Sequence, residues 1–302
     1  MTTNNVFTNV YGMARSLLAL GTLLTLTFCN KADLFPETVF SDAKNAKLDI
    51  TNFNLFFIFN YENLSIPYII AIIILIAVIS GYFPFITGLA HAWVSYSFFT
   101  CSFIIEGGDQ ITQILTLLIL PITLLDKRLN HWGNKEFLKY KSPAFTDYFA
   151  KTVFQIISLQ MSVLYFFAGS DKLNVLEWKN GSALYYWFNH NLFGANNIIL
   201  SMFTPIVNNP YISPLLNWAV ILLEILLFGA IFMNEKQRLR LLPWGISFHF
   251  LIFLVHGLPT FFLAMTAGLI LYLVPPNKFI GNTYFLFPRR WFSKNLISSP
   301  IK

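Results

Sequence analysis

The sequence predicts an all-α, polytopic integral membrane protein, a bundle of about eight transmembrane helices. Of the 302 residues, 56% are hydrophobic and only 11% are charged, whereas a soluble domain carries about 25% charged residues. The mean hydropathy is +0.59. The apolar residues also form separate blocks that approach the length needed to cross a hydrocarbon layer of about 30 Å. The pI of 9.2 then reports membrane topology and gives no reason to expect nucleic-acid binding.

Eight apolar blocks are expected to form the membrane helices. Runs such as IIAIIILIAVI at 69–79 lack the alternation of a membrane β-strand, so we expect helices and not a barrel. Several blocks are shorter than about 20 residues, which leaves tilting, a kink at Pro121 or incomplete crossing open. The blocks are 14–29, 64–81, 83–105, 111–125, 152–169, 214–233, 244–257 and 259–275.

The distribution of charge predicts that both ends of the chain lie in the cytoplasm. With the N-terminus inside, fifteen of the twenty Lys and Arg residues fall on the inner side, and nine of the fourteen Asp and Glu residues fall outside. Basic residues collect in cytoplasmic loops, so this separation supports an even number of spans. It also places Asp171 and Lys172 on the outer face. Because no linker or long repeat divides the chain, we expect residues 1–302 to form a single transmembrane domain.

Three further features concern the outer side. The block 14–29 is expected to be a retained span and not a signal peptide, because it is long and no small-residue cleavage pattern follows it. Cys29 and Cys101 are the two cysteines, and both a disulfide and two unpaired thiols remain open. The aromatic stretch 170–213 is expected to form an interfacial or re-entrant cover over the outer side of the bundle.

Lys172 is the first candidate site residue, because it ends a long apolar run. It follows the small residues 168–170, which let helices approach closely. In the ordinary interpretation the side chain reaches lipid headgroups or pairs with Asp171 or Glu177. The alternative is a general base, which requires burial to favour the neutral amine against the carboxylates nearby. Both interpretations remain open.

Asp109 and His249 are the other candidates. EGGDQ at 106–110 places Asp109 at the start of a helix, where the helix dipole favours a carboxylate, so helix capping and ligand binding both explain it. His249 is either a core residue bonded to Ser247 or a backbone carbonyl, or a functional group. Glu224 raises the same question, because a carboxylate in an apolar span needs a partner or a proton. No metal-ligand spacing, phosphate loop or nucleophile elbow is present.

Five segments carry a resemblance that covers nearly the whole chain. They are NVYGMARSLLALGTLLTLTFCN, FIIEGGDQITQIL, DKRLNHW, YFFAGSDKLNVLEWKNGSALYYW and WGISFHFLIFLVHGLPTFFLAM. Together they resemble the sporulation-delaying protein B family, within the HTTM membrane domains related to vitamin K-dependent gamma-glutamyl carboxylase.

The resemblance to the carboxylase implies roles for the three candidates. Lys172 matches the lysine that acts as base in the carboxylase, and His249 matches its late histidine. Asp109 stands where the carboxylase has a further histidine, a departure that changes charge and hydrogen bonding and speaks against full carboxylase activity. By the same resemblance the chain would bind a quinone or quinol, in an outward-facing cavity with Lys172 at its mouth.

The resemblance to the sporulation-delaying B family implies a maturation factor for a secreted antimicrobial peptide toxin. The factor would lie in the bacterial cytoplasmic membrane and act with a small A partner on a toxin precursor. Whether it is itself an enzyme is left open. The alternatives are a quinone-linked peptide-modifying enzyme resembling the carboxylase and a non-enzymatic immunity, export or scaffold protein.

Overall fold

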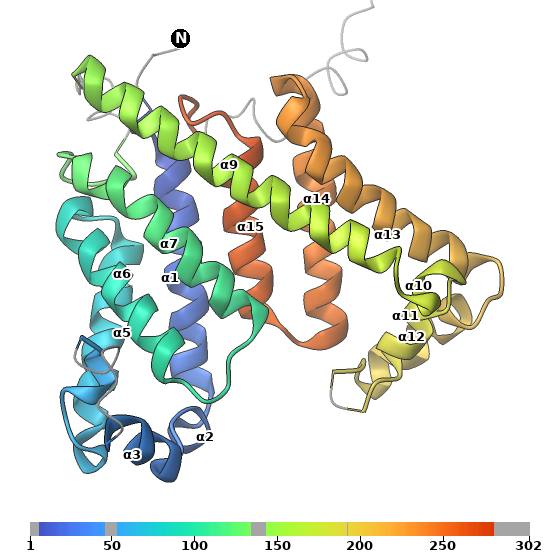
Figure 1. Ribbon diagram of the computed structural model, residues 1–302, viewed down its shortest axis with the longest axis horizontal. Helices are drawn as coiled ribbons and strands as arrows, with labels where there is room; N and C mark the ends of the chain where they lie inside the picture. Colours follow the sequence, from blue (N-terminus) through green and yellow to red (C-terminus); the bar gives the residue numbers. More distant parts are fainter. Residues whose placement is uncertain (1–5, 46–52, 134–142, 192, 281–302) are drawn as a thin grey trace, which may run out of the picture.

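The regular structure is helical throughout the part of the chain that the computed structural model describes, residues 6–45, 53–133, 143–191 and 193–280 (Figure 1). The charge count of the sequence also includes basic residues that lie outside that part: 135, 139, 141 and most of the basic tail. The long helices are α1 (Asn9–Phe28), α5 (Ser65–Ser80), α6 (Pro84–Cys101), α7 (Gly107–Leu125), α9 (Ala144–Lys172), α13 (Ile212–Gly229), α14 (Glu235–His256) and α15 (Pro259–Leu273).

Short helices connect the long ones. They are α2 (Lys31–Leu34), α3 (Glu37–Asn45), η1 (Leu55–Phe57), η2 (Tyr61–Asn63), α10 (Leu176–Lys179), α11 (Ala183–Phe188), α12 (Asn197–Val207) and η3 (Ala230–Phe232).

Each of the eight predicted apolar blocks forms a helix, which confirms the all-α membrane bundle. By length and composition, six helices among the described residues can cross a membrane: α1, α5 with the turn before it, α7, α9, α13 with η3, and α14. α6 and α15 are not among the six. α15 has 15 residues, or about 22 Å at about 1.5 Å per residue, less than the hydrocarbon thickness.

Two helices extend well beyond their apolar blocks. α9 begins at Ala144 and α14 at Glu235, whereas the apolar blocks begin at 152 and 244, so the polar residues before each block are helical too. In α14 the reason is a capping box, in which Asn234 and Gln237 each bond the other's backbone N–H at 3.1 Å. Hydropathy marks where the chain is apolar, whereas caps decide where a helix begins.

α15 lies at the centre of the bundle and α9 crosses it diagonally (Figure 1). α15 packs against α1, α7, α9 and α14, while α9 also packs closely on α13. The helices α1, α5, α6 and α7 form one group, and α13 and α14 lie on the other side of α15. α13 and α14 make few contacts with each other. α9 is therefore the helix that holds α13 to the rest of the molecule.

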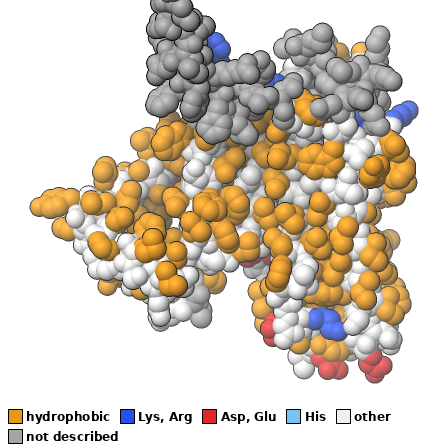
Figure 2. All heavy atoms as spheres, turned by 180° about the vertical axis from the view of Figure 1, so that it is seen from behind, with side chains coloured by type: hydrophobic (Ala, Val, Ile, Leu, Met, Phe, Trp, Pro, Cys, Tyr) orange, Lys and Arg blue, Asp and Glu red, His pale blue; other side chains and the backbone are white. Residues whose placement is uncertain are grey.

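The surface is that of a protein surrounded by lipid. Ile69, Ile73 and Ile76 form a stripe on α5 and are 54–60% exposed. Figure 2 shows hydrophobic side chains over most of the visible face, with acidic side chains gathered at its lower end. α2 and α3 lie at that end of Figure 1 and contribute Asp33 and Glu37. The exposed apolar band indicates a bilayer environment.

The two ends of the described chain meet at the opposite end of the bundle. Thr8 Oγ1 donates to the Pro276 carbonyl at 2.7 Å. Asn9 exchanges two hydrogen bonds with the backbone of Ile280, at 2.5 and 2.8 Å. The start of α1 and the end of α15 therefore lie on the same side, as an even number of spans requires. That this side is cytoplasmic remains a prediction.

A buried polar network closes this predicted inner end. Arg128 makes two hydrogen bonds to the Asp126 carboxylate, at 2.9 and 2.8 Å, and a third to the Tyr11 hydroxyl at 3.1 Å. The side chains of this ion pair are 1% and 0% exposed. The hydrogen bonds of Arg128 thus hold the DKRLNHW segment, which follows α7, against the start of α1. Arg128 belongs to the interior, although the charge count treated it as a loop residue.

Arg15 and His131 extend the same network. Arg15 lies 3.4 Å from Nδ1 of His131 and donates to Thr87 Oγ1 at 2.5 Å. The fully buried His131 also approaches the Ser16 hydroxyl at 3.4 Å. Burial, together with the positive charges of Arg15 and Arg128, lowers the pKa of His131 to about 3. The imidazole is therefore neutral and serves as a hydrogen-bonding partner.

Candidate functional site

Lys172 is paired with a carboxylate that lies 52 positions later in the sequence. Its Nζ donates to Glu224 Oε1 at 2.8 Å and to the Ala168 carbonyl at 3.0 Å. The Lys172 side chain is 21% exposed and that of Glu224 only 5%. The expected partners were Asp171 or Glu177, and that interpretation is wrong. Asp171 is exposed, because neighbouring helical residues do not share a face.

A close approach of α9 and α13 makes this pair possible. A Cβ added to Gly169 would lie 2.9 Å from Ile225 Cδ1 and 3.4 Å from Glu224 Cβ. The absence of a side chain at Gly169 lets the two helices touch directly beside the pair, as small residues do in membrane bundles. The small residues before Lys172 therefore position its partner.

A second polar pair lies on the same face of α9. Tyr165 precedes Lys172 by seven residues, or two helical turns. The Tyr165 hydroxyl lies 2.8 Å from Nε2 of His249 on α14, and both side chains are buried. We expected Ser247 or a backbone carbonyl as the partner of His249. Tyr165 takes that place instead, because it is the polar group that α9 brings to α14.

The two pairs form one cluster between α9, α13 and α14, which we call the outer cluster: Tyr165, Lys172, Glu224 and His249. Lys172 acts electrostatically on His249, and Glu224 acts on Tyr165. Among the described residues, Oε2 of Glu224 and Nδ1 of His249 are buried without a hydrogen-bond partner. Buried polar atoms of that kind are costly, so they mark a place for a further polar group.

The outer cluster has an aromatic neighbour on its exposed side. The Lys172 ammonium lies 5.1 Å from the centre of the Trp178 ring, a cation–π distance. Beyond it, α11 and α12 lie across the start of α13 and the end of α14, on the predicted outer side. His256 at the end of α14 bonds the Phe193 carbonyl at 2.5 Å, and Phe188, Val207 and Val255 pack together. The stretch 170–213 thus covers this side, as expected.

Asp109 lies outside the outer cluster. Its Oδ2 accepts a hydrogen bond from the Glu106 N–H at 3.0 Å, so it caps α7. The preceding Gly108 is pressed against α15, where an added Cβ would lie 2.5 Å from the Phe261 nitrogen. The Phe261 ring in turn contacts His249, with centroids 5.5 Å apart. No hydrogen bond or ion pair within the described residues joins Asp109 to Lys172 or His249.

Both cysteines are free thiols. Cys29 is the C-cap of α1 and Cys101 ends α6, so both lie toward the predicted outer ends, as expected. Partial burial, with the nearby carboxylates of Asp109 and Glu106, raises the pKa of the Cys29 thiol. The structure thus shows the unpaired alternative for both thiols.

Sequence reasoning singled out Lys172, His249 and the oddity of Glu224, and it named Trp178 as an aromatic residue that either stacks on a quinone or anchors at the interface, but it missed Tyr165. The seven-residue spacing from Tyr165 to Lys172 was a usable signal, because it places both on one helix face. Trp178 carried no signal that separates it from an interfacial aromatic residue.

Two known proteins are similar to the chain over nearly its whole length. Sporulation-delaying protein SdpB of Bacillus subtilis (strain 168) is 36% identical over 283 residues, which cover 91% of this chain and 84% of SdpB. The uncharacterized protein YitO of the same organism is 35% identical over 285 residues, 93% of this chain and 90% of YitO. No known family model matches the chain, and no solved structure matches it. This identity, shared along a multi-pass helical bundle, shows that the chain belongs to the SdpB family of membrane proteins.

Proposed function

We propose that this protein is a membrane maturation factor for a secreted antimicrobial peptide toxin and that the outer cluster carries its chemistry. The identity to SdpB across 91% of the chain supports the biological role. The Lys172–Glu224 hydrogen bond of 2.8 Å is the observation that carries the chemical part. A small SdpA-like partner, a precursor peptide as substrate and cytoplasmic termini belong to the same proposal.

The outer cluster is suited to moving protons. Lys172 and Glu224 share one hydrogen-bonded proton, and the ammonium is partly exposed, so an arriving peptide can replace part of its contact with Glu224. Such a pair supplies a general acid and a general base within one hydrogen bond. Tyr165 on α9 and His249 on α14 form the buried half of the cluster and hold α9 in a fixed orientation against α14.

The experiment replaces Lys172 by Ala, and separately by Arg, in a toxin-producing strain. We expect both variants to accumulate in the membrane and to lose most of the mature toxin, because Arg keeps the charge but cannot release its proton. Asp171→Asn, at the exposed neighbouring position, is the matched control. Undiminished toxin from both Lys172 variants would remove the catalytic role, and undiminished toxin after gene deletion would remove the maturation role.

A quinone-linked reaction is the alternative that the carboxylase resemblance suggests, but the contacts of the aromatic residues near Lys172 favour other roles for them. The Lys172 ammonium lies over one face of the Trp178 ring. Tyr185 and Tyr186 stand edge to face with centroids 5.5 Å apart, and both are partly exposed, as expected for interfacial anchors. We therefore derive no step through a quinone.

An immunity role is separated from maturation by a simple comparison. Expression of this chain alone would protect a sensitive strain against added toxin if it were an immunity protein. We expect no protection, because the proposal assigns the outer cluster to acid–base chemistry on the precursor and not to capture of the mature toxin.

A further inference from the structure

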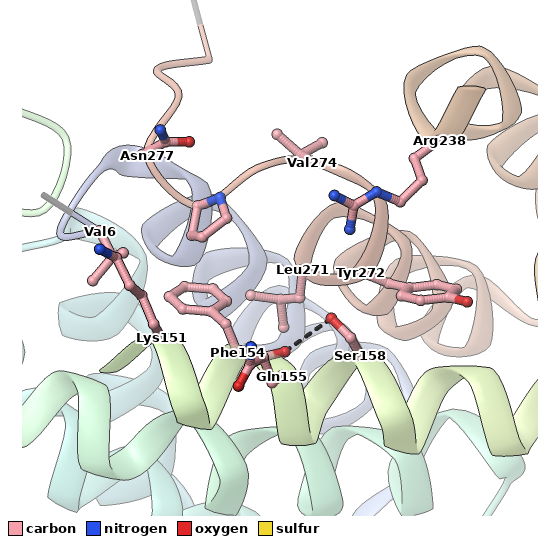
Figure 3. A pocket seen from close by; sticks show the side chains of 11 residues that line it. Val6, Lys151, Phe154, Gln155, Ser158, Arg238, Leu271, Tyr272, Val274 and Asn277 are labelled. Atoms are coloured by element: carbon pink, nitrogen blue, oxygen red, sulfur yellow. Dashed lines mark hydrogen bonds between the residues drawn. The ribbon is translucent and has the colours of Figure 1, made fainter. Parts of the chain in front are cut away.

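A cavity of about 400 Å³ lies at the other end of α9 from the outer cluster (Figure 3). One wall is a single face of α9, formed by Lys151, Phe154, Gln155 and Ser158, which have the spacing of neighbours on one helix face. The start of α14, the end of α15 and the chain that follows α15 form the rest. The cavity thus lies at the end where the two termini meet.

The cavity is positively charged. Lys151 on α9 and Arg238 on α14 enter it from different sides (Figure 3), and none of its described lining residues is an acid. Nε of Arg238 is buried without a hydrogen-bond partner in the described chain. The acid in the same first turn of α14, Glu235, is already paired with Lys278. Two cations without a lining carboxylate attract an anion.

The remaining lining residues favour an anion with an apolar part. Phe154 and Leu271 lie between the two cations in Figure 3, and Val6, Val274 and Pro276 continue the apolar wall. Gln155 and Asn277 add amide groups. The volume of about 400 Å³ lies within the usual range for a small-molecule site.

We propose that this cavity binds the headgroup of an anionic phospholipid. Arg and Lys bind phosphate oxygens strongly, and Arg does so with two parallel hydrogen bonds. Basic pockets between membrane helices on the cytoplasmic side are suited to lipid phosphate groups. The phosphate would lie between Lys151 and Arg238, with the glycerol and the first methylenes along Phe154 and Leu271. This site is independent of the outer cluster and of the proposed maturation function.

The test measures the melting temperature of the purified full-length protein in detergent with added short-chain phosphatidylglycerol, phosphatidylcholine or inorganic phosphate. We expect phosphatidylglycerol at saturation to raise Tm by about 5 °C. Phosphatidylcholine and millimolar inorganic phosphate are expected to leave it within about 1 °C. In Lys151→Ala and Arg238→Ala the phosphatidylglycerol shift should be lost. Arg240→Ala, an exposed arginine on the same helix, should retain it.

Several results would overturn the proposal. Equal shifts with phosphatidylglycerol and phosphatidylcholine in the wild-type protein would show no anion selectivity, and this comparison needs no variant to fold. An equal shift with inorganic phosphate would assign the site to a free anion. A full phosphatidylglycerol shift in both cavity variants would place the lipid elsewhere.

Discussion

Two ion pairs lie inside the described part of this bundle, and they are built differently. Asp126 and Arg128 are two residues apart, are almost completely buried and share two hydrogen bonds. Lys172 and Glu224 come from different helices, share one hydrogen bond, and leave Lys172 about one-fifth exposed. Each pair also keeps one buried atom without a hydrogen-bond partner among the described residues, Nη1 of Arg128 and Oε2 of Glu224, so exposure and helix origin are what separate them.

The difference separates a structural pair from a reactive one. A bidentate pair that is sealed from solvent has no route for a proton or a substrate, and its removal leaves a buried charge. A pair with one partly exposed member, as Lys172 is, can exchange its partner. We therefore assign Asp126 and Arg128 to the stability of the predicted inner end and Lys172 and Glu224 to the proposed chemistry.

The largest effect is expected for Asp126→Ala. It leaves the Arg128 guanidinium buried without its counterion, which should reduce the free energy of unfolding by about 3–5 kcal/mol. The measurement is thermal unfolding in detergent together with the amount of protein in the membrane. Asp171→Ala, which removes an exposed carboxylate, should change stability by less than about 0.5 kcal/mol. Similar small losses in both variants would contradict the structural role of the inner pair.

Glu224→Gln should affect function more than folding. The amide keeps the size and one hydrogen bond but cannot accept the Lys172 proton, so mature toxin should fall about 100-fold, the usual contribution of a general acid or base. Glu177→Gln, at an exposed position beside α9, is the matched control. Equal amounts of toxin from the two variants would contradict a functional role for the Lys172–Glu224 pair.

The pH dependence of stability should report His131. The folded protein holds its pKa near 3, whereas an unfolded histidine titrates near about 6.5. The unfolded chain therefore takes up the proton first, so this contribution is complete above about pH 6.5 and is lost as the pH falls toward 3. Lowering the pH from 6.5 to 5 should cost about 2 kcal/mol through this group.

The measurement is Tm against pH for the wild type, His131→Gln and His256→Gln. The His131 variant should show a flatter curve between pH 6.5 and 5, while His256→Gln controls for the loss of a histidine elsewhere. Parallel curves for all three proteins would show that His131 is not held neutral by the inner network.

The smallest effect is expected for Asp109→Asn. Asn can still accept the bond from the Glu106 N–H, but it loses the charge that the helix dipole favours, so stability should fall by no more than about 1 kcal/mol. Mature toxin should stay within about threefold of wild type, because Asp109 contributes a cap and not a proton. A large loss of toxin with unchanged stability would instead place Asp109 in the reaction, as the carboxylase resemblance suggests.

The sequence predicted where the long helices lie better than the residues at which they begin and end. Apolar blocks placed all eight long helices, because hydropathy is a local property of the chain. It did not predict that α9 and α14 extend into polar sequence, since Asn234 and Gln237 set the start of α14 by a side-chain contact. Nor did it predict that Arg128 is buried, because a basic residue after an apolar block looks the same whether it meets water or Asp126.

By itself the sequence determined that the chain is a helical membrane protein of the SdpB family and that Lys172 and His249 are its unusual polar groups. Only the tertiary structure decided their partners. Glu224 and Tyr165 lie 52 and 84 positions from the groups they bind, and nothing local to either segment encodes that distance. The partners follow from the close approach of α9 to α13 at Gly169 and from its contact with α14, a packing arrangement set by the shapes of all three helices together.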